Sequence, residues 1–206
     1  MTRIDPGLNF FGHSVTAHMM LEDLEQFLSV VDEFLCKTAK RLAGDRDQLG
    51  IDRSDAFAET FPEILYASVI TAVVSFLERE SRTFTDALQE ACSSLLSARD
   101  LSGTWLERFR KYCEKIALLP VCLTNPEWED LKGLVEVRNC LVHSGGWLLD
   151  FQGCSTVEAF AQRHKIALSQ GTYLRANLRL AQVVLERIKA FIEQIYRVAL
   201  NRYPAT

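Results

Sequence analysis

Three polar residues with different chemistry lie close together in the stretch LVEVRNCLVHSGG, residues 134–146. Arg138 carries a permanent cation whose donor fork matches a phosphate, Asn139 offers an amide, and His143 can exchange a proton near neutral pH. On a helix, Asn139 and His143 are i and i+4 and share a face. Arg138 lies about 140° round the helix from His143, at ~100° per residue, and its long side chain can reach across the last turn. A helix here would gather all three groups at its end.

These three side chains suit the cleavage of RNA without a metal ion. In that reaction the ribose 2′-OH loses its proton and attacks the neighbouring phosphorus, while the departing 5′-oxygen gains a proton. His143 would act as the general acid or base, Arg138 would stabilise charge on the phosphoryl oxygens, and Asn139 would position the imidazole or the ribose. One histidine performs only one of the two proton transfers well. Two copies of the chain related by a two-fold axis would supply both, so a homodimer is expected.

Ordinary helix-end chemistry explains the same residues in a different way. The helix dipole favours a histidine or an arginine in the last turn, and two glycines commonly end a helix. On spacing alone, this explanation is preferred to catalysis. Cys140, inside the stretch, is expected to pack in the core, because no base is evidently placed beside it.

The sequence RNCLVH resembles the R-N-x-x-x-H motif of HEPN domains, with Arg138, Asn139 and His143 at the motif positions. The segment SFLERESR, residues 75–82, resembles the first core helix of that family and adds Glu78 as a supporting residue. An ion pair with Arg82 is the alternative role for Glu78. The resemblance covers about residues 60–200.

The resemblance implies a metal-independent endoribonuclease that is active as a dimer in a toxin–antitoxin or phage-defence system. Its partners would be an RNA substrate and an antitoxin or regulatory protein. Other members of the family keep the fold as non-catalytic dimerisation modules or as modules that bind a nucleotide or a protein. A third interpretation of the sequence is a regulatory scaffold whose basic last helix contacts an acidic partner.

Helical periodicity runs along most of the chain and predicts an all-α, HEPN-like helical bundle. An irregular excursion over residues 147–172 is expected to separate the motif helix from a long C-terminal helix. The segment STVE, residues 155–158, matches a capping box and predicts a short helix inside that excursion. Residues 1–50 are expected to form an acidic amphipathic helix and a linker packed on the bundle, and residues 51–206 the HEPN-like domain. The predicted helices are 19–44, 61–98 with a bend or break near the charged segment 78–83, 104–119, 126–144, 155–164 and 173–202, with a loop at 44–55.

Composition narrows the class of protein. The chain has 206 residues, of which 48% are hydrophobic, enough for one well-packed domain. No run of 18 or more apolar residues and no signal peptide are evident, so no membrane segment and a cytoplasmic location are expected. The six cysteines form no C-x-x-C pair, and neither a metal site nor a cofactor is predicted. A net charge of -4 and a pI near 5.6 argue against non-specific coating of nucleic acid.

Overall fold

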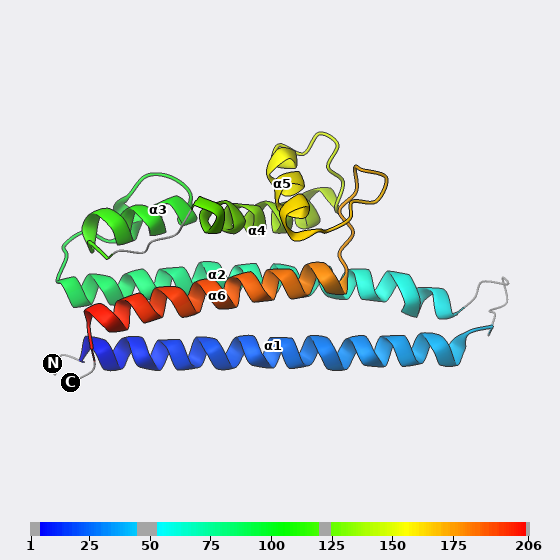
Figure 1. Ribbon diagram of the computed structural model, residues 1–206, viewed down its shortest axis with the longest axis horizontal. Coiled ribbons are helices and arrows are strands. Elements are labelled where there is room, and N and C mark those ends of the chain that lie inside the picture. The colour runs from blue at the N-terminus through cyan, green and yellow to red at the C-terminus, as the bar shows by residue number, and fades with distance from the viewer. Residues whose placement is uncertain (1–4, 45–52, 120–124, 205–206) are drawn as a thin grey trace. The chain divides into compact units, whose positions relative to one another are not determined.

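The described part of the chain is almost entirely helical. The computed structural model describes residues 5–44, 53–119 and 125–204 (Figure 1). Over these ranges no strand forms beyond isolated bridges of Tyr173 with Trp147 and Ser169, so the predicted all-α class is confirmed. The helices are α1 (Pro6–Leu42), α2 (Phe61–Cys92), α3 (Trp105–Lys111), α4 (Asn125–Ser144), α5 (Cys154–His164) and α6 (Leu178–Arg202), with short π- or 3₁₀-helical turns at Ala56–Thr60, Ala98–Asp100 and Tyr112–Ile116.

The chain packs as two compact units, and α1, α2 and α6 each contribute to both. The first unit takes its described residues from Met1–Leu21, Ser75–Trp128 and Arg187–Thr206. The second takes them from Glu22–Val74 and Glu129–Glu186. The domain boundary expected at residue 50 stays a prediction. Most of the loop predicted at 44–55 lies outside the described residues.

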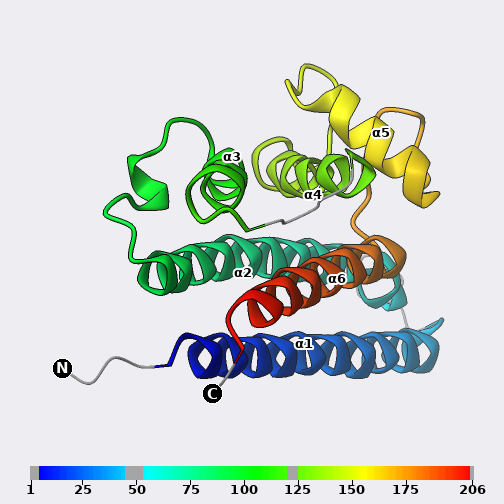
Figure 2. The ribbon, with the colours of Figure 1, turned by 60° about the vertical axis from the view of Figure 1, so that its left-hand side comes forward.

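An aromatic cluster forms the core of the first unit. Phe84 of α2 lies 5.7 Å from Phe10 of α1, 5.2 Å from Tyr196 of α6 and 6.0 Å from Phe109 of α3, measured between ring centroids. These contacts hold the N-terminal part of α1 beside the C-terminal parts of α2 and α6 (Figure 2). Tilted and edge-to-face ring pairs of this kind stabilise a core beyond the area that they bury.

A buried carboxylate lies where the charged segment 78–83 predicted a bend or a break in the second helix. α2 instead continues as one uninterrupted helix through this segment. Glu80 and Ser81 are buried, with 7% and 2% exposure, and the Tyr196 hydroxyl donates a hydrogen bond to Glu80. Two of the polar residues in this segment therefore belong to the core rather than to a solvated interruption.

The second unit is built around a close approach of α4 and α5. A Cβ added at Gly133 of α4 would lie 2.5 Å from Cδ2 and 2.8 Å from Cβ of Phe160 on α5. Only glycine lets the Phe160 side chain approach the α4 backbone so closely. Leu134 and Val137 of α4 are fully buried beside this contact.

Side-chain hydrogen bonds cap the N-terminal ends of some helices and not of others. Thr104 caps α3 in a capping box with Glu107, and Asn177, whose side chain accepts a hydrogen bond from the Leu180 N–H, caps α6. The predicted capping box at Ser155 is wrong, because α5 begins one residue earlier, after Gly153, and has no side-chain cap. The final helix also begins at Leu178 rather than at residue 173.

The segment Ala56–Cys92 is long and apolar enough to cross a membrane when only its length and composition are considered. This is weak evidence, since the core helix of a soluble protein meets the same criterion. Ile70, Val73 and Leu77 on this segment are fully buried, and they supply core contacts. The absence of a membrane segment stays a prediction.

Candidate functional site

The last turns of α4 hold the three residues of the motif, Arg138, Asn139 and His143. The helix is fixed in the second unit by a buried face that includes Val137 and Cys140, each with 0% exposure. Arg138 and Asn139 flank this face and are half-buried, whereas His143 is exposed in the last turn. The anchored helix thus presents an imidazole to solvent beside a guanidinium and an amide.

Neither Asn139 nor His143 makes a side-chain hydrogen bond to another described residue. The structure therefore does not place the Asn139 amide as a hydrogen-bonding support for the His143 imidazole. Both groups are free to bond to water or to a ligand. For Arg138, Nε is buried while the residue as a whole is half-exposed, so its guanidinium is partly drawn into the protein.

Two glycines end α4 and turn the chain sharply. Gly145 and Gly146 have φ of +58° and +93°, values that favour glycine. The Gly146 N–H donates to the carbonyl of Cys140, six residues earlier, at 3.1 Å, which folds the chain back over the helix end. A Cβ at Gly146 would also lie 2.5 Å from the Leu174 carbonyl oxygen. Both glycines thus have a structural role, as the helix-end explanation predicted.

The segment after α4 is held by backbone hydrogen bonds to the chain around Leu174. The Leu174 N–H donates to Gly146 O at 2.8 Å, and the Leu148 N–H donates to Thr172 O at 2.9 Å. The turn at Gln170 and Gly171, both with positive φ, brings this segment back beside the end of α4. The predicted irregular excursion is therefore an ordered support for the motif.

A network of charged and phenolic groups fixes that support to α2. The Tyr173 hydroxyl donates to Glu63, and Arg175 lies 3.2 Å from Glu63 and 3.3 Å from Glu59. The hydrogen bond to Glu63, with burial, raises the pKa of Tyr173 to about 12. The protonated phenol therefore persists through the neutral range and keeps its bond to the carboxylate.

A second contact missed by sequence reasoning joins α5 to α4. The Arg163 Nε–H donates to Asp130 at 2.8 Å, and His164 Nε2 lies 3.1 Å from the same carboxylate oxygen. The His164 ring also lies 4.5 Å from that of Phe160. No local pattern signals this cluster, because its partners are 33 residues or more apart along the chain.

Glu78 and Cys140 have structural explanations. Glu78 lies in the first unit, on α2, where it accepts a hydrogen bond from Arg82 one turn later, as the alternative prediction stated. Cys140 is fully buried, and its thiol lies 3.8 Å from the Trp147 carbonyl oxygen. Burial raises the pKa of the Cys140 thiol, which disfavours the nucleophilic thiolate.

Exposed apolar side chains lie within the motif and directly after it in the sequence. Val142, Trp147 and Leu149 are 49%, 53% and 66% exposed, and the Trp147 ring lies 5.0 Å from that of Tyr173. Exposed apolar groups near a candidate site are typical of surfaces that meet another molecule. In the sequence, WLL follows the two glycines directly. Only the burial of each residue shows that Trp147 and Leu149 are exposed.

The chain was compared with known proteins, and no protein-family model, no curated protein and no solved structure matches it. Within the described ranges, no three His, Cys, Asp or Glu side chains gather as metal ligands would. The candidate site is therefore defined by Arg138, Asn139 and His143 and by the segments that position them.

Proposed function

We propose that the protein is a metal-independent endoribonuclease of the HEPN type that acts as a homodimer. The observation that carries the proposal is the exposed His143 imidazole on a turn fixed by Gly145 and Gly146, beside Arg138 and Asn139. His143 is the general acid or base, Arg138 stabilises charge on the phosphoryl oxygens, and Asn139 positions the ribose.

The reaction needs two proton transfers, and each copy offers one motif histidine. In the proposed dimer, His143 of one copy accepts the 2′-OH proton as this oxygen attacks phosphorus. His143 of the second copy donates a proton to the 5′-oxygen as its bond to phosphorus breaks. The products are a 2′,3′-cyclic phosphate and a free 5′-hydroxyl. The exposed Val142 and Leu149 favour such an association, because burying them removes apolar surface from water.

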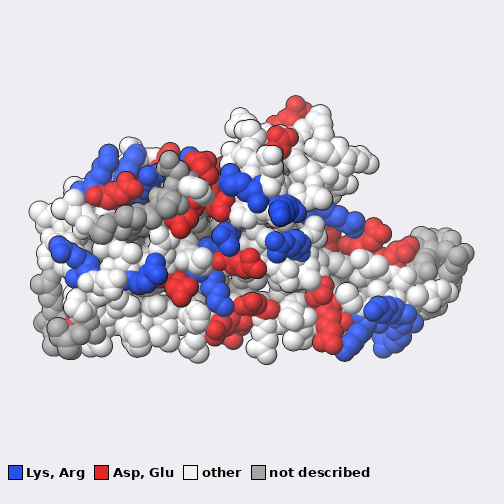
Figure 3. All heavy atoms as spheres, viewed as in Figure 1, with Lys and Arg blue, Asp and Glu red and all other residues white. Residues whose placement is uncertain are grey.

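The proposed contacts with RNA are confined to side chains near the candidate site. On the face seen in Figure 3, Lys and Arg side chains are interspersed with Asp and Glu side chains. Arg138 and the exposed Trp147 are the groups near the site that would hold a phosphate and stack on a base. Within this proposal the enzyme acts in the cytoplasm, in a toxin–antitoxin or phage-defence system, and an antitoxin or regulatory protein restrains it.

The test is RNA cleavage by the purified protein in excess EDTA. His143→Ala should lower the rate by about a hundredfold or more, the usual contribution of a positioned acid or base. His18→Ala, which removes another exposed imidazole from α1, is the matched control and should cleave normally. Circular dichroism checks that both variants fold. Equal cleavage by His143→Ala and the wild type would sink the catalytic assignment.

A second candidate function is a non-catalytic module of the same fold that dimerises or binds a protein or a nucleotide. It is favoured by exposed apolar side chains that recur every three or four residues in two stretches of α1, residues 8–19 and 27–34. Those 42% exposed or more include Leu8, Phe11, Val15, Met19, Phe27, Val30 and Phe34. This candidate predicts no cleavage under any condition and a dimer that survives His143→Ala. A light-scattering mass equal to one chain would contradict both dimer-based functions.

A further inference from the structure

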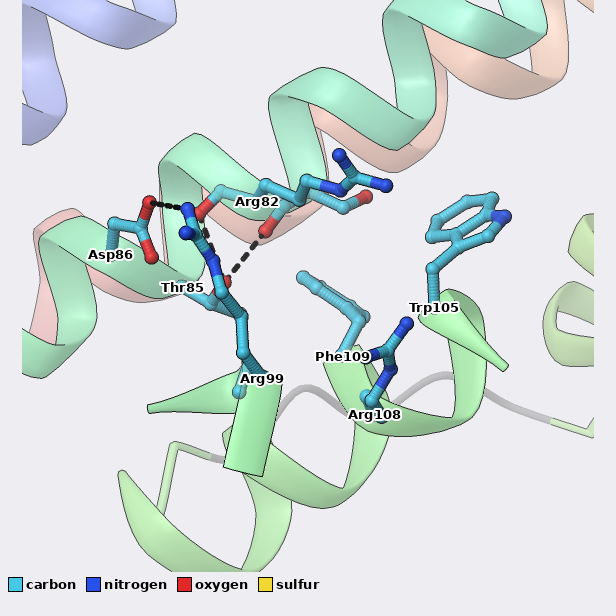
Figure 4. Close-up of a pocket in the computed structure, with 9 residues that line it drawn as sticks. Arg82, Thr85, Asp86, Arg99, Trp105, Arg108 and Phe109 are labelled. Carbon is cyan, nitrogen blue, oxygen red and sulfur yellow. Dashed lines mark hydrogen bonds and ion pairs between the residues drawn. The ribbon is translucent and has the colours of Figure 1, made fainter. Parts of the chain in front are cut away.

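Each unit contains a cavity that none of the motif residues line. The cavity of the first unit is shown in Figure 4, and three arginines, Arg82, Arg99 and Arg108, line it with one carboxylate, Asp86. The cavity of the second unit has a volume of about 620 Å³, within the range of small-molecule sites. Residues of α1, of α2 and of the segment before α6 line this second cavity, and all of them belong to the second unit. It contains charges of both signs, so the pairing of these charges decides what it can bind.

Three of the charged groups in the cavity of the second unit already interact with one another. Arg175 lies 3.2 Å from Glu63 and 3.3 Å from Glu59. The Tyr173 hydroxyl also donates a hydrogen bond to Glu63. These contacts fix the segment before α6 to α2, so the charges of this group serve the fold. The other two charged residues that line the cavity, Asp32 and Lys40, both belong to α1.

Asp32 is a half-buried carboxylate without a cationic partner. The Tyr66 hydroxyl donates a hydrogen bond to it. Burial, together with this bond, raises the pKa of Tyr66 well above its usual range, so the phenol stays protonated and neutral. Asp32 forms no ion pair with any Lys, Arg or His that the structure describes. Because a carboxylate partly withdrawn from water is stabilised by a nearby cation, Asp32 is well suited to bind an ammonium group.

Lys40 supplies the opposite charge, two turns further along α1. It is exposed, and its ammonium group forms no ion pair within the described ranges. The Cα atoms of Asp32 and Lys40 are about 12 Å apart along the helix, at ~1.5 Å per residue. Cys36 lines the cavity between them, and the apolar Phe57 and Pro62 line it from the Ala56–Thr60 turn and the start of α2. The unpaired charges are therefore separated by a less polar stretch of wall.

We propose that this cavity binds a small linear zwitterion, with its terminal ammonium group on Asp32 and its terminal carboxylate on Lys40. A ligand with a single charge would leave one of these two side chains without a partner. The span of about 12 Å suits an extended tripeptide, at ~3.3–3.6 Å per residue, or an ω-amino acid of similar length. Phe57 and Pro62 then contact the middle of the ligand. The proposal goes beyond RNA cleavage and does not depend on it.

Isothermal titration of the full chain with trialanine and with 8-aminooctanoate tests the proposal and distinguishes the two sources of such a ligand. At least one of them should bind, and the tighter one identifies the source. Its N-acetylated and its C-amidated forms, which each lack one charge, should bind about tenfold or more weakly. Dialanine should also bind about tenfold or more weakly than trialanine, because it is too short to reach both charges.

Variants of α1 with matched controls locate the site. Asp32→Asn and Lys40→Gln each remove one of the unpaired charges and should weaken binding about tenfold or more. The amide oxygen of Asp32→Asn can still accept the Tyr66 hydrogen bond, so the urea midpoint of this variant checks that the fold is kept. Glu33→Gln and Lys37→Gln are the controls, because these exposed residues pair with each other outside the cavity. Both should bind the zwitterion as the wild type does.

Cys36 gives a local measure of occupancy. It is exposed and lines the cavity, so the bound zwitterion should slow its alkylation by iodoacetamide, whereas Cys92 in the first unit should react at an unchanged rate. The proposal is overturned if neither zwitterion binds, if either blocked form binds as tightly as its parent, or if Asp32→Asn and Lys40→Gln keep the wild-type affinity. His143→Ala should bind the zwitterion normally, so a failure here is distinct from a failure of the catalytic proposal.

Discussion

Replacing Gly146 with alanine tests whether the end of α4 is held against the chain around Leu174. Gly146 has φ of +93°, and an added Cβ would lie 2.5 Å from the Leu174 carbonyl oxygen. An ordinary residue at positive φ costs about 1–2 kcal/mol. Relieving the overlap moves backbone, which weakens the Leu174 to Gly146 and Leu148 to Thr172 hydrogen bonds of 2.8 and 2.9 Å. At about 1 kcal/mol for each bond, and with the conformational cost, the free energy of unfolding should fall by about 3–4 kcal/mol.

Gly145→Ala is the matched control. Gly145 also has positive φ, +58°, but an added Cβ would meet nothing within 4 Å. Gly145→Ala should therefore lower the free energy of unfolding only by the conformational cost of about 1–2 kcal/mol. Urea unfolding of both variants, followed by circular dichroism, measures the difference. If the two free energies of unfolding agree within about 0.5 kcal/mol, the close approach of Gly146 to Leu174 does not constrain the helix end.

Two further predictions concern tyrosines. Tyr196→Phe removes the hydroxyl that bonds to the buried Glu80 and should lower the free energy of unfolding by about 1.5–3 kcal/mol. Adding Glu80→Leu should restore part of the lost stability, because the buried carboxylate is then removed as well. A loss below about 0.5 kcal/mol in Tyr196→Phe alone would contradict the prediction. Burial raises the pKa of Tyr112 from 10.0 to about 12. The hydrogen bond to Glu63 raises the pKa of Tyr173 from 10.0 to about 12. Because the unfolded chain then ionises first, stability should be complete below pH 10 and fall as pH rises from 10 to about 12. Urea unfolding across this window, with tyrosinate absorbance alongside, measures the loss, and a constant free energy would refute it.

Local chemistry was sufficient to predict α4 and its end. Pro126 and Glu127 lie in its first turn and the two glycines follow its last, so the boundaries predicted from sequence agree with the helix. The side chain of Asn125, the predicted cap, lies outside the described residues. Where a helix ends because of its own backbone and dipole, neighbouring residues are enough to locate it.

Other boundaries depended on burial that no local pattern reveals. α1 begins at Pro6, well before the predicted residue 19. The periodicity did not reveal this first part of the helix, because Phe10 and Ala17 are buried while Phe11 and Val15 beside them face solvent. Two apolar faces on one helix blur the period of 3.6 residues. The start of α5 was misplaced for a related reason, since a motif such as STVE caps a helix only if the chain enters there in an extended conformation.

The residues that support the candidate site could not be predicted, because their partners are distant in sequence. Glu63 and Tyr173 are 110 residues apart, and nothing in either neighbourhood signals their hydrogen bond. The motif side chains were different, since the spacing of Asn139 and His143 placed them on one face of a helix. Sequence therefore indicated the chemical groups, whereas tertiary packing decided how they are held.

Gly133 should be conserved more strictly during evolution than the residues of the motif. His143 is exposed, so a descendant that no longer needs it can replace it with little effect on packing. Gly133 has no such freedom, because even a methyl group there would overlap Phe160. Diverged relatives of this chain should therefore keep a glycine five positions before the place of Arg138 and an aromatic residue in the following short helix. That pair would identify the lineage even after the residues of the motif have been lost.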